Sequence, residues 1–113
     1  SADQYAGQTK SLVDAYRKQD LVLLDELMRV ADPGMGDYMD LLVYDRNEKW
    51  VNLLQEKMAD ASLLVAVGAG HLPGKKGLIQ LLRDRGYTVK PLPNTALFSA
   101  CNDHDSIRTA RGR

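Results

Sequence analysis

Residues 61–92, ASLLVAVGAGHLPGKKGLIQLLRDRGYTVKPL, decide the predicted fold of this chain. Residues 63–67 are apolar, partly β-branched and followed by glycine, which is typical of a strand buried on both faces. A helix is predicted over residues 75–85, because leucine and isoleucine recur on one face and Gly86 follows as a C-terminal cap. Residues 87–92 predict a second short strand. The stretch therefore indicates a right-handed β-α-β unit with parallel strands.

Helical periodicity precedes this unit over residues 4–18, 20–31 and 37–59, with a break at Asp32-Pro33-Gly34. Asp20 and Asp37 are the expected N-caps of the second and third helices. The predicted fold class is α/β, with three N-terminal helices packed on the β-α-β unit and its short parallel sheet. We divide the chain into a helical segment (1–60), the β-α-β unit (61–98) and a disordered or non-native tail (99–113).

The third helix carries an unusual charged residue. At 100° per residue, Arg46 falls in the middle of its apolar stripe and Asn47 falls at the edge. A guanidinium at such a position either reaches water along its stem or finds an acceptor, because an unpaired buried charge is costly. We expect Arg46 to be buried or half-buried near Trp50, where it would bind a carboxylate or an anionic group of a substrate.

Composition limits the class of protein. The chain has 113 residues, enough for one domain, and fifteen basic residues balance fifteen acidic ones. This balance predicts no nucleic-acid partner and no anionic membrane surface. Its longest apolar runs are too short for a transmembrane segment, and the single cysteine, Cys101, excludes an internal disulfide. Because the chain starts at Ser1 without a methionine, we expect a processed or cloned segment of a longer protein.

The loop after the first predicted strand admits several kinds of chemistry. His71 can ligate a metal or transfer a proton, while Gly68 and Gly70 let a ligand approach the backbone. A phosphate-binding P-loop is excluded, because Lys76 stands where its hydroxyl belongs. The spacing of Gly68, Gly70 and Gly74 leaves an NADP or other phosphate ligand as an alternative, with Lys90 as a reader of the 2′-phosphate. A further alternative is that the loop is only a tight turn and that the chain is a non-catalytic interaction module.

Several short motifs occur together here: Arg46-Asn47, Trp50, Gly68-Ala69-Gly70-His71, Leu72-Pro73-Gly74, Gly77-Leu78 and Gly86-Tyr87. In this combination the chain resembles the C-terminal half of the TraB/GumN family, which includes the Tiki proteins. The resemblance is close over residues 40–92 and loose over the preceding helices. It implies that the chain is an incomplete fragment of a larger TraB/GumN-like fold.

The family resemblance also implies a function. The proposed site of the family is that of a metal-dependent hydrolase, or more narrowly a peptidase, with two Gly-x-x-His motifs and a glutamate. This chain has only the second motif, and His104 does not form another. The resemblance therefore implies His71, Arg46 and Asn47 as catalytic residues, with His71 as the ligand of a divalent metal. It also implies a periplasmic, secreted or cell-surface location, and we expect the fragment itself to be inactive.

The predicted sheet also implies a partner. Two parallel strands leave both outer edges unpaired, which is marginal in isolation. We therefore expect this chain to join the missing N-terminal half of its parent, or to pair with a second copy as a homodimer or larger assembly.

Overall fold

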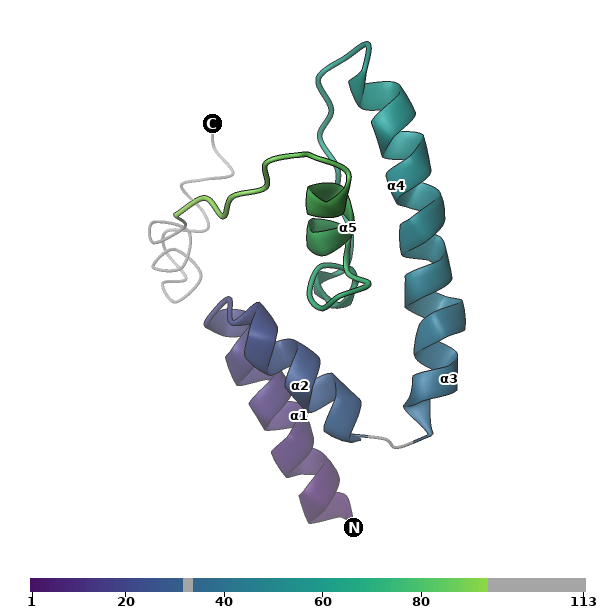
Figure 1. Ribbon diagram of the computed structural model, residues 1–113. Helices are drawn as coiled ribbons and strands as arrows, with labels where there is room; N and C mark the ends of the chain where they lie inside the picture. Colours follow the sequence, from purple (N-terminus) through teal and green to yellow (C-terminus); the bar gives the residue numbers. More distant parts are fainter. Residues whose placement is uncertain (32–33, 94–113) are drawn as a thin grey trace, which may run out of the picture.

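The structure is a computed structural model that describes residues 1–31 and 34–93. These residues form helices joined by turns and irregular segments (Figure 1). In chain order the elements are α1 (Ala2–Arg17), α2 (Leu21–Ala31), α3 (Met35–Met39), the π-helical segment η1 (Asp40–Tyr44), α4 (Asp45–Met58), the 3₁₀ turn η2 (Ala69–His71) and α5 (Leu78–Asp84). The predicted tail at residues 99–113 lies outside the described residues.

The predicted α/β class and β-α-β unit are wrong. Neither residues 63–67 nor residues 87–92 form a strand, and the described part of the chain contains no sheet. A strand exists only where a neighbouring strand completes its backbone hydrogen bonds, and these two segments run in different directions on either side of α5 (Figure 1). Leu64, in the middle of the apolar run, is 99% exposed. The run is therefore an irregular connection between α4 and η2.

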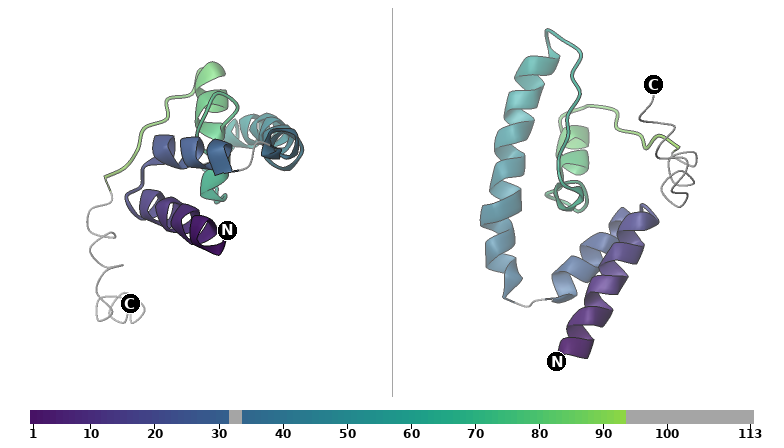
Figure 2. Two further views of the ribbon diagram at one scale, coloured as in Figure 1. Left: turned by 90° about the horizontal axis from the view of Figure 1, so that it is seen from below. Right: turned by 180° about the vertical axis from the view of Figure 1, so that it is seen from behind.

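The first two helices form an antiparallel hairpin. They lie side by side in each view of the fold (Figures 1 and 2). Asp20 caps α2 as expected, because its carboxylate accepts a hydrogen bond from the backbone N–H of Leu23 at 3.0 Å. Ala15 of α1 and Leu24 of α2 are both buried and supply the apolar core of this hairpin.

The elements α3, η1 and α4 form one continuous rod on the other side of the molecule (Figure 1). The rod begins at Met35, so Asp37 lies inside it and does not act as the predicted N-cap. In its middle, η1 has the wider π-helical turn, which inserts extra backbone and shifts the helical register. The shift turns Asn47 and Val51 inward as the two fully buried side chains of α4.

The helix α5 packs on α4 and ends as the sequence predicts. Gly86 has φ +90°, and its N–H donates to the Arg83 carbonyl at 2.9 Å, while the N–H of Tyr87 donates to Leu82 at 3.1 Å. This pair of bonds is a Schellman cap, which glycine closes without steric cost. The buried Leu78 lies at the other end of α5.

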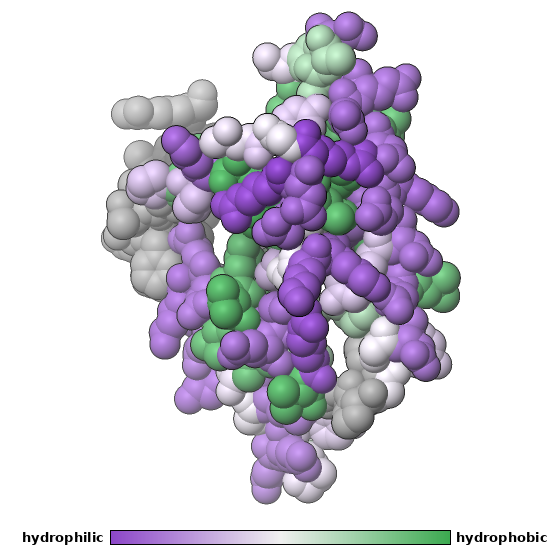
Figure 3. Space-filling view, in the orientation of Figure 1, coloured by the Kyte–Doolittle hydropathy of each residue, from purple (hydrophilic) through white to green (hydrophobic). Residues whose placement is uncertain are grey.

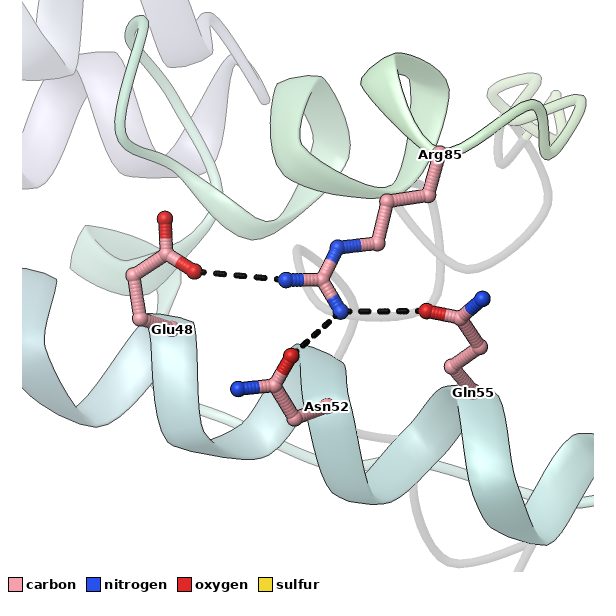
Figure 4. Close-up of polar contacts among 4 residues, drawn as sticks. All are labelled: Glu48, Asn52, Gln55 and Arg85. Carbon is pink, nitrogen blue, oxygen red and sulfur yellow. Dashed lines mark hydrogen bonds and ion pairs between the residues drawn. The ribbon is translucent and has the colours of Figure 1, made fainter.

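Arg85 fastens the end of α5 to α4. Its guanidinium donates to three side chains of α4: Asn52 at 2.5 Å, Gln55 at 3.1 Å and Glu48 at 3.4 Å (Figure 4). The Arg85 side chain is 27% exposed, so these bonds are partly shielded from water. The three contacts hold α5 in a fixed position along α4, which in turn places the loop before α5.

Gly77 is the tightest point of the fold. It is buried, and a Cβ atom added there would lie 2.2 Å from the Pro73 carbonyl oxygen and 2.3 Å from that of Leu72. We expect Gly77→Ala to lower the free energy of unfolding by about 1–3 kcal/mol, because both obstructing atoms belong to the backbone. In contrast, Gly7→Ala in α1 meets nothing within 4 Å and should raise stability by about 0.5–1 kcal/mol. Urea unfolding of both variants at one protein concentration checks this, and equal midpoints would contradict it.

Candidate functional site

The candidate site is built on the loop between residues 68 and 77, which leads into α5. The N–H of His71 donates to the Gly68 carbonyl at 3.0 Å, and the N–H of Gly77 donates to the Gly74 carbonyl at 3.1 Å. Gly74 has φ +87°, a conformation that glycine adopts readily. These bonds fold the loop into two successive tight turns, with His71 at the end of the first.

Asn47 holds this loop against the rod. Its side chain is fully buried, and its Nδ2 donates to the His71 carbonyl at 3.1 Å and to the Lys76 carbonyl at 2.9 Å. Its Oδ1 lies 2.8 Å from Nδ1 of the His71 ring. A single amide group thus joins α4 to two points of the loop and to the imidazole itself.

Trp50 and Arg46 complete the surroundings of the histidine. The rings of Trp50 and His71 have centroids 4.7 Å apart and planes tilted by 46°. The Arg46 guanidinium lies 5.0 Å from the centroid of Trp50, and its Nη1 donates to the Leu42 carbonyl at 3.4 Å. The prediction that Arg46 lies near Trp50 is confirmed. Its predicted burial is wrong, because the residue is exposed.

The environment of His71 favours the neutral ring. Partial burial lowers the pKa of His71 below its usual value of 6.5, and the nearby positive charge of Arg46 lowers it further. Both causes destabilise the protonated, positively charged form of the ring. His71 is therefore set up to act as a metal ligand or a proton acceptor at neutral pH.

This pKa shift predicts a pH dependence of stability. Because the pKa is lower in the folded chain than in the unfolded chain, the contribution of neutral His71 is fully present above pH 6.5 and is lost as the pH falls through the folded pKa. We expect Arg46→Gln to raise the pKa of His71 in an NMR titration. Lys49→Gln, which removes an exposed charge from the same helix, is the matched control. Equal pKa values in the two variants would refute the role of Arg46.

Each of the two glycines of the predicted cofactor site, Gly68 and Gly70, has a side chain as its neighbour. A Cβ atom at Gly70 would lie 3.1 Å from the terminal methyl of Met28, so this glycine fits closely against α2. A Cβ at Gly68 would only make an ordinary contact of 3.8 Å with the His71 ring. Their role in binding a cofactor stays a prediction.

The described residues supply one histidine to a metal, and they contain no group of three or more His, Cys, Asp or Glu side chains that could hold an ion. A catalytic zinc usually has three protein ligands. Glu48 of α4 pairs with Arg85 at 3.4 Å. The chemistry of His71 suits a metal ligand, but the described residues do not complete a ligand set.

The sequence analysis assigned no role in this site to Lys76 or Gly77, although both residues shape it. Lys76 contributes its carbonyl to Asn47, while its Nζ lies 3.1 Å from the Asp40 carboxylate and 5.3 Å from the centroid of the Tyr44 ring. Gly77 permits the tight approach described above. Neither role has a signal in local periodicity, because both depend on the rod and the loop meeting in space.

Comparison with known proteins gives consistent relatives. The chain is 29% identical over 99 residues to "Metalloprotease TIKI homolog" from Amphimedon queenslandica, which covers 79% of this chain and 19% of that protein. It is 40% identical over 63 residues to "Metalloprotease TIKI2" from Xenopus tropicalis, covering 52% and 12%. It is also 40% identical over 55 residues to "Metalloprotease TIKI1" from Homo sapiens, covering 46% and 11%.

The chain thus spans less than a fifth of the length of these relatives. No solved structure matches it. Among the described residues, no helix is long and apolar enough to cross a membrane. The model of the TraB/PrgY/gumN family matches residues 1–91, which include every residue of the candidate site, and the chain belongs to this family.

Proposed function

We propose that this chain is the part of a metal-dependent hydrolase, in the narrower form a peptidase, that contributes the histidine ligand. The observation that carries the proposal is the placement of His71. Its ring is kept neutral, lies against Trp50 and is hydrogen-bonded by the buried Asn47. The hydrogen bond at Nδ1 fixes the orientation of the ring, as the outer-shell partners of metal-binding histidines commonly do. The similarity to proteins named metalloproteases supports the same chemistry.

The residues of the chain have distinct roles in this proposal. His71 would hold a divalent metal, which would polarise a substrate carbonyl and activate water when bound. Arg46 is exposed above Trp50, with its Nη1 donating to Leu42. Its remaining N–H groups are placed to bind a carboxylate or another anionic group of the substrate. Asn47 keeps the loop and the ring in place.

The site needs a partner. Because the described residues supply a single metal ligand, the remaining ligands come from the N-terminal half of the parent protein or from a second copy of the chain. We place the assembled protein in the periplasm, in the extracellular medium or at the cell surface. In this arrangement the isolated chain does not hydrolyse peptides.

The alternative of an NADP-binding domain loses its structural basis. A dinucleotide fingerprint needs a glycine-rich turn between a strand and a helix. The described residues contain no strand, and the helix after the loop, α5, is only seven residues long. We therefore retain the hydrolase as the proposed function.

The test uses the protein encoded by the complete reading frame beside the 113-residue chain. Peptide hydrolysis by the complete protein should be lost in EDTA and restored by Zn²⁺ or Mn²⁺. The 113-residue chain alone should be inactive under all conditions. Chelator-resistant hydrolysis by the complete protein would exclude metal dependence. Strong chelator-sensitive hydrolysis by the chain alone would show that it needs no partner.

A further inference from the structure

The two nitrogen atoms of the His71 ring have different surroundings. Nδ1 lies 2.8 Å from Oδ1 of Asn47, a fully buried side chain of α4. Nε2 forms no hydrogen bond with any described residue, and no buried polar side-chain atom of the described chain lacks a partner. Nε2 is therefore open to solvent, and only Nδ1 is engaged by the protein.

The direction of the bond at Nδ1 follows from the other bonds of Asn47. The two hydrogen atoms of its Nδ2 are needed by the His71 and Lys76 carbonyls, at 3.1 and 2.9 Å. Rotating the amide by 180° would place its oxygen against both carbonyl oxygens, which is repulsive. The oxygen therefore faces the ring. Because an amide oxygen only accepts, Nδ1 carries the proton and donates it.

We infer that Asn47 is a positioning residue that fixes the neutral ring of His71 in the Nδ1–H tautomer and leaves Nε2 as the free nitrogen of the ring, where a metal or a proton would bind. The tautomer of a histidine is set by the hydrogen bond at its other nitrogen, and metal-binding histidines commonly donate one N–H to an oxygen of the protein. Trp50 adds a second constraint, because its ring lies 4.7 Å from the imidazole and limits rotation. The choice of Nε2 rests on the proposed function, whereas the tautomer does not.

The ¹⁵N chemical shifts of the histidine rings, measured in the labelled 113-residue chain above pH 7.5, test the tautomer directly. The chain has two histidines, so His71→Gln assigns the signals. We expect a protonated Nδ1 and an unprotonated Nε2 in the wild type. A dominant Nε2–H form would overturn the inference whatever the variants do.

Two substitutions separate positioning from simple support of the loop. Asn47→Asp keeps an acceptor for Nδ1 but sets its second oxygen against both carbonyls, so it should lower stability, while the Nδ1–H signature should remain in the folded variant. Asn47→Leu removes the acceptor, and the tautomer ratio should shift roughly tenfold towards Nε2–H, as the loss of one hydrogen bond predicts. An unchanged ratio in Asn47→Leu would overturn the inference. If neither variant folds, the wild-type spectrum decides, because a dominant Nε2–H form there overturns the inference by itself.

A Zn²⁺ titration of the complete protein separates this inference from the proposed function. A shift of the Nε2 signal on metal addition supports both. A fixed Nδ1–H tautomer with no metal-induced shift would support the role of Asn47 and contradict the metal-dependent function. Metal binding at Nδ1 would overturn the inference and leave the metal-dependent function standing.

Discussion

Replacing His71 by alanine in the complete protein is expected to lower metal-dependent hydrolysis by more than about 100-fold. Even the loss of an outer hydrogen-bonding partner of a metal ligand typically costs 10–100-fold, and the loss of the ligand itself costs more. The assay is hydrolysis at saturating Zn²⁺, with bound metal measured in parallel. Both quantities should fall together, because the imidazole is the single side chain of the described residues that the proposed function assigns to the metal.

The control for this prediction is Lys75→Ala, an exposed position in the same loop. It should retain near-normal hydrolysis and the same metal content. His71→Gln offers a second variant that preserves side-chain bulk next to Trp50 and Asn47. Full activity in both His71 variants, with an intact fold by circular dichroism, would exclude His71 from the chemistry.

Periodicity predicted the helices of this chain but misplaced one face. Summing 100° per residue through the third helix placed Arg46 at the centre of the buried stripe. The π-helical turn at Asp40–Tyr44 changes the rotation, so the buried centre is Asn47 instead. Leu42, four residues before Arg46, is 53% exposed. Local periodicity carries no mark of such a turn, whose Asp40 and Tyr44 side chains lie near Lys76 of the loop at residues 68–77.

The two predicted strands are absent for a different reason. An apolar, β-branched run satisfies the local requirements of a strand, but the ladder bonds must come from a second segment. The described chain supplies none to residues 63–67. Two local signals that need no distant partner were read correctly, although the predicted cap at Asp37 was not. Asp20 caps α2 through its own side chain, and Gly86 closes α5 within its last turn.

The candidate site was predicted in part. The resemblance to a family singled out His71, Arg46 and Asn47, and the structure places all three within one cluster around Trp50. Periodicity alone would have given Asn47 a marginal place at the edge of a helix face. Its importance comes from three hydrogen bonds to residues 24 and 29 positions away along the chain. Interactions of this range are set by tertiary packing and leave no local pattern.

The described part of the chain leaves much apolar surface exposed. Only four apolar side chains of the described residues are buried: Ala15, Leu24, Val51 and Leu78. Patches of apolar residues interrupt the polar surface (Figure 3). A groove of about 1410 Å³ opens between the α1–α2 hairpin, the loop before α5, and residues 89–92. Its floor includes Leu21, Leu72 and Ile79, so its lining suits an apolar partner surface.

The last prediction is that this chain associates with a second copy, or with the rest of its parent protein, at micromolar concentration. Tyr38, Leu41, Val22 and Leu64 are 61%, 65%, 70% and 99% exposed. Burying one Val or Leu side chain contributes about 1.5–3 kcal/mol, so several together match the 5–15 kcal/mol stability of a whole domain. Sedimentation should show dimers or larger species; pairing about a twofold axis would give a closed dimer.

Leu64→Glu should shift these species towards monomer without loss of helix, whereas Lys10→Glu, on the exposed surface of α1, should not. A compact wild-type monomer with cooperative unfolding would contradict the prediction, because it would mean that the chain closes its own core.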